Sequence, residues 1–273
     1  DTVVFEGVSK AARAASLAHL KGGQYVSVSA YDIKNLKSAP AAVVYDVDGD
    51  FAASEVKQRL SELFGEELDC SFIRGASVKK IKIYEIDRQK EYDCTCAVAV
   101  EEPEFLHKER YDYADLLQIV RMLRAPGGCP WDRVQTNDTI KQNMIEEAYE
   151  LVDAINRKDD DGIEEECGDV LLQAAFHTVL KEEQGAFTSG DVLSRVVKKL
   201  IFRHSHIFGK DKASDEDSAL NVWEKNKMEE KHQTTFTESL KAVPVNFPAC
   251  MRAQKVGKRA AKSGMDFLSS LSA

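Results

Sequence analysis

Apolar residues recur at three- and four-residue steps between Met144 and Leu172, a pattern typical of two amphipathic helices. The first set is Met144, Ala148, Leu151, Val152 and Ile155, and the second is Ile163, Cys167, Val170, Leu171 and Ala174. Each set predicts a stripe that is buried against a neighbouring element. The polar segment NRKDDDG between the sets predicts a link that lets the two helices pair antiparallel.

Carboxylates flank both stripes. Glu146, Glu147 and Glu150 lie beside the first, while Glu166 and Asp169 lie one turn apart beside the second. If the helices pair, four or five carboxylates converge, and a cation is needed to offset their repulsion. Oxygen ligands without His or Cys favour Mg²⁺, or Mn²⁺ as a substitute, over Zn²⁺. The alternative is a pair of solvated glutamate-rich faces.

Residues 1–104 alternate short apolar runs with turn signals. We expect strands at residues 24–30, 41–45, 70–75, 80–86 and 94–100, and a helix at 53–64. In KIKIYEID, Ile81 and Ile83 should face one side and the two lysines the other, as in a strand near a sheet edge. No phosphate-binding glycine loop, metal cluster or activated nucleophile is evident, so a scaffold or remnant is the simplest interpretation.

The pattern becomes helical after the charged segment Glu101 to Arg110, where we place a domain boundary. We expect helices from Tyr113 to about Pro126, across each of the two acidic motifs, from 218 to 231, and from 250 to 262. A further helix should run from Ser189 or Asp191 to about His204, with Val192, Val196 and Leu200 pointing inward. A tight loop should present residues 129–132, and Thr136 or Asn137 should cap the EExxE helix. The expected architecture is multi-domain: a small α/β segment (1–104), an all-α module (110–233) and a basic helical tail or linker (234–273).

Several side chains could serve chemistry or packing. Lys199 and Arg203 lie one turn apart and predict either a solvated basic face or a phosphate clamp beside the metal. Trp131 could plug a helix junction or stack on a nucleobase, and Trp223 could be core or part of a base pocket. For Cys129, and for the histidines of the HSH sequence, structural roles are the simpler interpretation.

Composition narrows the class of protein. The 273 residues carry a formal net charge of −9, which argues against broad duplex binding. No apolar run reaches the ~18–20 residues of a membrane span. The six cysteines include no CxxC pair and suit reduced thiols in the cytoplasm. Because the chain begins at Asp1 inside what reads as a domain, we expect a fragment or processed product.

Six segments occur in order between Gly127 and Phe267: GGCPWDRVQT, IEEAYELVDAI, EEECGDVLLQAAFH, KKLIFRHSHIFG, NVWEKNK and RAQKVGKRAAKSGMDF. Together they resemble a MazG-type nucleoside triphosphate pyrophosphohydrolase. The resemblance implies an all-α, dimeric module that uses Mg²⁺ to hydrolyse NTPs or dNTPs to the monophosphate and pyrophosphate.

The resemblance also implies roles for individual residues. The metal ligands would be Glu147, Glu150, Glu166 and Asp169. Lys199, Arg203 and Trp223 match positions that hold triphosphate and base, and Glu165 lies close to the ligands. With Trp131, the stacking candidate named above, these are the candidate substrate-binding residues. Glu146 lies near the metal without clearly being a ligand, so our hypothesis makes it the general base that accepts a proton from the attacking water.

In the order of its segments and in residue pattern, the sequence over residues 16–36, 44–75 and 82–88 resembles the C-terminal part of a tetrapyrrole methylase-like domain. Fusion of such a domain to a MazG module is a bacterial architecture. The half of that domain with the glycine-rich cofactor loop has no counterpart in this sequence, so methyl transfer by this chain alone is not expected. Two rival hypotheses stay open: a catalytically silent module that binds nucleotide or metal, and a methyltransferase lobe.

Overall fold

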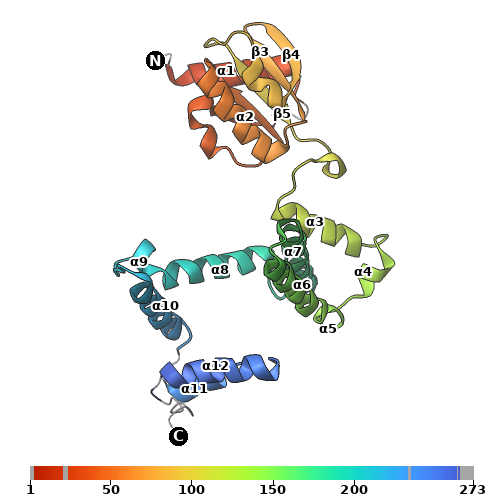
Figure 1. Ribbon diagram of the computed structural model, residues 1–273. Coiled ribbons are helices and arrows are strands. Elements are labelled where there is room, and N and C mark those ends of the chain that lie inside the picture. Colours follow the sequence, from red (N-terminus) through yellow and green to blue (C-terminus); the bar gives the residue numbers. More distant parts are fainter. Residues whose placement is uncertain (1–2, 21–23, 233–234, 263, 265–273) are drawn as a thin grey trace. The chain divides into compact units, whose positions relative to one another are not determined.

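The computed structural model describes residues 3–20, 24–232, 235–262 and 264. The chain forms two compact units, Asp1–Met122 and Leu123–Ala273. The first contains a β-sheet with helices, and the described part of the second is helical (Figure 1). An α/β segment followed by a helical region was the predicted fold class. Among the described residues, no helix is both long and apolar enough to cross a membrane.

The sheet of the first unit has five strands, in the order β1-β2-β5-β3-β4. Their bounds are β1 Val26–Ser29, β2 Ala41–Tyr45, β3 Asp69–Arg74, β4 Ser77–Lys82 and β5 Ala97–Glu101. β1 runs parallel to β2, and the other neighbours are antiparallel. All five strands overlap predicted ones, and β4 lies at the sheet edge as KIKIYEID indicated.

The two sheet faces are covered by different helices. Helix α1 (Val3–Ala18) packs on the face that carries Val43 and Ala99. Helix α2 (Asp50–Phe64) packs on the opposite face, together with the 3₁₀ turns η1 (Ala30–Asn35) and η2 (Ile83–Arg88). Successive strand residues therefore enter different cores, as the two-residue period of a strand requires.

Ile81 and Ile83 are both buried in the same core, as KIKIYEID indicated. The strand itself ends earlier than predicted, because the chain turns into η2 at residue 83, where the Glu85 side chain accepts a hydrogen bond from the Lys82 backbone N–H (2.8 Å). Helix α1 was not predicted. Among the side chains of α1 that the structure describes, the buried ones are alanines at positions 11, 14, 15 and 18, which give a weak hydrophobic signal.

Ten helices are described from residue 113 onward. They are α3 Tyr113–Arg124, α4 Pro130–Val134, α5 Asn137–Ile140, α6 Asn143–Arg157, α7 Asp160–Glu183, α8 Ser189–Arg203, α9 Ser205–Phe208, α10 Glu216–Glu230, α11 Phe236–Lys241 and α12 Ala249–Lys262. The predicted helices correspond to α3, α6, α7, α8, α10 and α12. Met265 to Phe267, which close the last resembling segment, lie outside the described residues.

The segment before α6 was predicted incorrectly. Residues 130–134 form the short helix α4, which begins at a proline, a residue suited to the first helical position. Thr136 caps α5 rather than the EExxE helix, since its side chain accepts from the Thr139 backbone N–H (3.3 Å). Helix α6 begins only at Asn143.

The predicted buried stripes are also wrong in part. Within α6 only Ala154 is buried, while Val152 and Ile155 are 50% and 52% exposed. Leu171 and Leu200 are about half exposed too, at 51% and 46%. The buried apolar residues of α7 instead lie in its second half, from Ala175 to Leu180. Helical periodicity identifies an apolar face, but a neighbouring element must cover it, and the described residues of a single chain supply none there.

Candidate metal and nucleotide site

Helices α6 and α7 form an antiparallel hairpin with a two-residue link. Lys158 ends α6 in the left-handed conformation (φ 55°). Asp159 then caps α7, because its Oδ1 accepts a hydrogen bond from the Gly162 N–H (3.1 Å). A Cβ at Gly162 would lie 3.4 Å from the Ala154 Cβ, so two small residues allow the helices to approach closely. This turn sets EExxE against ExxD.

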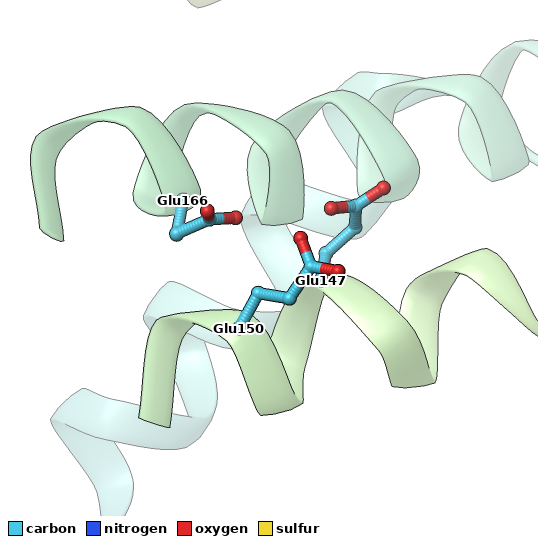
Figure 2. Close-up of side chains that lie close together, drawn as sticks. All are labelled: Glu147, Glu150 and Glu166. Atoms are coloured by element: carbon cyan, nitrogen blue, oxygen red, sulfur yellow. The ribbon is translucent and has the colours of Figure 1, made fainter. Parts of the chain in front are cut away.

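Three of the predicted metal ligands meet between these helices. One carboxylate oxygen from each of Glu147, Glu150 and Glu166 lies within 4.8 Å of the others. Figure 2 shows Glu147 and Glu150 on α6 and Glu166 on the facing helix α7. The convergence expected from the two motifs is therefore present for these three residues.

The carboxylates are held in an unfavourable environment. Burial raises the pKa of Glu147, and the charges of Asp169 and Glu150 raise it further. Burial likewise raises the pKa of Glu166, followed by the charges of Glu150 and Asp169. The Glu166 Oε2 atom is buried and accepts no hydrogen bond from any described residue. A buried acceptor without a partner is costly, so this donor set fits a hard, oxygen-ligated cation.

The remaining acidic candidates lie around this cluster. Asp169 is half-buried on α7, one turn after Glu166, and its charge acts on the cluster although it lies outside the group of three. Glu146, in the first turn of α6, and Glu165 on α7 are exposed. The charge of Glu146 contributes to the raised pKa of Glu147, and that of Glu165 to the raised pKa of Glu166.

Gln173 is a polar side chain of this site that the sequence interpretation missed. It is only 9% exposed, and its Nε2 donates to the Glu147 Oε1 at 3.4 Å. It follows Glu166 and Asp169 by seven and four residues, so all three share one face of α7. A polar residue continuing the ExxD face by one turn was the available signal.

The basic candidates form a second group. Arg203, the last residue of α8, is 7% exposed, and its Nε donates to the Glu230 Oε2 at 2.7 Å. Its Cζ lies 5.2 Å from the centroid of the Trp223 ring, and the Lys227 Nζ lies 4.5 Å from that centroid. Burial lowers the pKa of Lys227, and the nearby Arg203 charge adds to the effect. Lys227 was also missed, although it stands four residues after Trp223.

A cavity of about 790 Å³ opens beside α8. It is lined by Phe187, Asp191, Val192, Ser194, Arg195, Val196, Lys198, Lys199, Phe202 and Glu230. Lys199 thus lines the cavity together with Glu230, the partner of Arg203. Among the described residues that line it, none belongs to the carboxylate cluster, so within one chain the structure does not bring Lys199 against the three glutamates.

Trp131 and the HSH segment are placed as follows. Trp131 is 58% exposed on α4, so it does not plug a helix junction. The His204 Nδ1 lies 2.7 Å from the Leu200 carbonyl oxygen, which is a capping contact at the end of α8. Cys129 and the five other cysteines are free thiols.

The comparisons with known proteins agree with this geometry. Residues 135–208 match the model of the MazG nucleotide pyrophosphohydrolase domain. The chain is 41% identical over 153 residues to a nucleoside triphosphate pyrophosphohydrolase of Escherichia coli, covering 56% of this chain and 58% of that protein. It is 39% identical over 155 residues to the nucleoside triphosphate pyrophosphohydrolase/pyrophosphatase MazG of Thermotoga maritima, covering 57% and 59%.

A longer match includes the sheet-containing unit. The chain is 35% identical over 247 residues to the uncharacterized protein YabN of Bacillus subtilis. This match covers 88% of this chain and 50% of that protein. The chain thus spans between half and three fifths of the length of these relatives. The carboxylate hairpin α6–α7 and helix α8 therefore lie in a region that matches the MazG nucleotide pyrophosphohydrolase domain.

Proposed function

We propose that the helical unit hydrolyses nucleoside triphosphates, NTPs or dNTPs, to the nucleoside monophosphate and pyrophosphate by attack of water on the α-phosphorus. The observation that carries this proposal is the convergence of Glu147, Glu150 and Glu166 within a region that matches the MazG domain. The named pyrophosphohydrolase relatives match the same half of the chain and support it.

The four acidic residues Glu147, Glu150, Glu166 and Asp169 would hold Mg²⁺, or Mn²⁺ in its place. When bound, the cation would offset phosphate charge and lower the pKa of a bound water. The carboxylates would hold the cation in a fixed position, because they come from two packed helices with a short link. Such positions are more rigid than positions on loops. Gln173 restrains one of them through its hydrogen bond to Glu147.

The phosphates need further positive charge, because a triphosphate carries more negative charge than one divalent cation neutralises. Lys199 and Arg203 would supply it from α8, while Glu165, Trp131 and Trp223 would contact the rest of the nucleotide. The exposed ring of Trp131 is free to stack on a base. Trp223 lies against Arg203 and Lys227, so it would also hold these two cations beside the nucleotide that it contacts.

Glu146 is our candidate for the general base. It is exposed and adjacent to the cluster without belonging to the group of three, so it could accept the proton of the attacking water. We expect Glu146→Gln to lose turnover while keeping metal affinity, and Glu150→Gln to lose metal affinity. If Glu146→Gln kept near-wild-type turnover across pH, another group would be the base.

The direct test is to incubate the protein with each NTP and Mg²⁺ and to separate products by anion-exchange chromatography. Monophosphate plus pyrophosphate supports the proposal, whereas diphosphate plus orthophosphate indicates another phosphohydrolase reaction. Absence of any product, with nucleotide binding retained, would favour the alternative of a catalytically silent binding module. Glu166→Gln is the matched negative control.

Three further assignments belong to this proposal. We infer that residues 110–233 are the catalytic module, that it works as a homodimer, and that the sheet-containing segment is the C-terminal part of a tetrapyrrole methylase-like domain. The exposed apolar faces of α6 and α8 support the dimer. The six free cysteines support a cytoplasmic location. Neither nucleic acid nor a membrane is expected as a partner.

A further inference from the structure

We propose that Glu230 is a positioning residue: it holds the Arg203 guanidinium so that its two terminal nitrogens form a preoriented fork for a phosphate group of the substrate. This inference rests on the proposed function, because it assumes that Arg203 contacts the triphosphate. Glu230 lies on helix α10 and belongs neither to the acidic motifs nor to the basic pair of α8.

The contact between the two side chains leaves the fork open. Glu230 accepts a single hydrogen bond, from the Arg203 Nε at 2.7 Å. Among the described residues, neither Nη atom of Arg203 has a hydrogen-bond partner, and neither is fully sealed from solvent. The Nη1 and Nη2 groups together match the two oxygens of a phosphate, a geometry that lysine cannot provide.

One face of α10 packs against the end of α8 around Arg203. Trp223, Asn226, Lys227 and Glu230 stand at helical spacings of three, four and seven residues, and three of them contact the end of α8. Trp223 lies against the guanidinium. The buried Asn226 amide donates to the Phe202 carbonyl oxygen (3.2 Å) and to the Ser205 Oγ (2.6 Å). Asn226 therefore holds the Phe202 backbone carbonyl before Arg203 and the Ser205 side chain after it.

Glu230 places the pair beside the cavity that Lys199 lines. Glu230 itself is a lining residue, and Arg203, which is not one, stands one turn after Lys199 on α8. A long arginine side chain loses conformational freedom when it binds, and a partner that fixes it beforehand reduces this loss. A buried guanidinium also requires a counter-charge. Glu230 meets both needs without occupying the fork.

Competition is the opposite possibility: Glu230 could occupy Arg203 in place of phosphate. The two possibilities predict opposite changes in anion affinity when Glu230 is removed. If Glu230 positions Arg203, its removal weakens anion binding; if it competes, removal strengthens binding.

The test uses the full chain and isothermal titration calorimetry with inorganic tripolyphosphate in the absence of metal. We expect Glu230→Ala to raise the dissociation constant about tenfold, and Glu230→Gln, whose amide oxygen can still accept from Nε but which lacks the counter-charge, to raise it less. Glu229→Ala, an exposed neighbour, is the matched control and should change nothing. In NTP turnover, Glu230→Ala should raise KM with little change in kcat.

Unchanged or tighter tripolyphosphate binding by Glu230→Ala would overturn the proposal, as would failure of the wild type to bind it. If Glu230→Ala loses its helical circular dichroism, Glu230→Asp replaces it. The shorter side chain should also weaken binding, and equal affinity would count against the proposal. If the wild type binds tripolyphosphate but hydrolyses no NTP, only the proposed function is contradicted. If the wild type hydrolyses NTP and Glu230→Ala keeps the wild-type tripolyphosphate affinity and KM, only this inference is contradicted.

Discussion

Glu147 and Glu166 each have a raised pKa because the fold buries them and surrounds them with other carboxylates. A carboxyl whose pKa is raised in the folded state stabilises the fold while it is protonated, and this contribution is lost as the pH rises through the raised pKa. The cation-free cluster therefore opposes folding at neutral pH. Binding of a cation would reverse that effect.

A substitution at Glu166 should separate stability from metal binding. In EDTA at neutral pH we expect Glu166→Gln to raise the Tm, because it removes one charge from the cluster. Above the ordinary glutamate pKa of 4.5, the wild type should lose more stability with rising pH than the variant. Added Mn²⁺ should stabilise the wild type and leave Glu166→Gln unchanged, measured by differential scanning calorimetry. Glu164→Gln, an exposed neighbour, serves as control, and a Tm below that of wild type in EDTA would contradict the account.

Gln173 should matter through Glu147 rather than through packing. The change Gln173→Leu removes the donor to the Glu147 Oε1 and replaces this buried side chain by an apolar one of similar volume. Loss of a group that orients a metal ligand typically weakens metal affinity by 10-fold or more, so we expect about tenfold weaker Mn²⁺ binding by electron paramagnetic resonance. Gln173→Asn, which keeps an amide, should restore part of the affinity. Wild-type affinity in Gln173→Leu would show that the hydrogen bond does not orient Glu147.

At the scale of elements, Arg124 at the end of α3 joins segments far apart in the sequence. Its Nε and Nη2 each donate to the Glu183 carboxylate at 2.8 Å, at the end of α7. Its Nη1 donates to the carbonyl oxygens of Asp132 and Gln135 (3.2 Å to the latter), which flank the end of α4. The guanidinium also lies 5.4 Å from the centroid of the Phe176 ring. One arginine thus orients the α4 segment that carries Trp131.

Arg124→Lys should therefore destabilise the helical unit although it keeps the charge. A lysine cannot make the paired contact with Glu183 and both carbonyl contacts together. We expect the free energy of unfolding to fall by about 2 kcal/mol, from the several hydrogen bonds lost, as measured by urea denaturation. Glu183→Gln, at an exposed position, should cost less. A larger loss from Glu183→Gln than from Arg124→Lys would contradict this assignment.

At the scale of the whole molecule, α6 and α8 leave apolar side chains open to solvent. Ile145, Val152 and Ile155 on α6 and Leu193, Val197, Leu200 and Ile201 on α8 are each about half exposed. Helices of this length gain most of their stability from packing of an apolar face. A second copy of the chain is the occupant that we propose.

Multi-angle light scattering should give a dimer, and Val152→Glu together with Leu200→Glu should shift it towards monomer by placing charges in the apolar contact. If the shared contact completes the site, the same change should lower NTP turnover. Replacement of the exposed Val134 by Glu is the control for added charge elsewhere. A strict monomer with full NTP turnover would refute the dimer.

The sequence by itself determined most of the local structure and the chemistry of the acidic motifs. The strands, the main helices and the pairing of EExxE with ExxD follow from residue spacing, because periodicity and turn residues act over a few positions. Spacing did not indicate α1, whose described buried side chains are alanines. It also did not indicate the 3₁₀ turn at Ile83, which depends on a hydrogen bond from Lys82 to Glu85.

The tertiary structure decided which side chains meet. Which faces of α6 and α8 are covered, the donation from Gln173 to Glu147, and the contact of Arg203 with Glu230 depend on packing between helices. Helical periodicity says that an apolar face exists and not what covers it. A hydrogen bond between residues far apart in the chain is fixed only when the helices that carry them have packed.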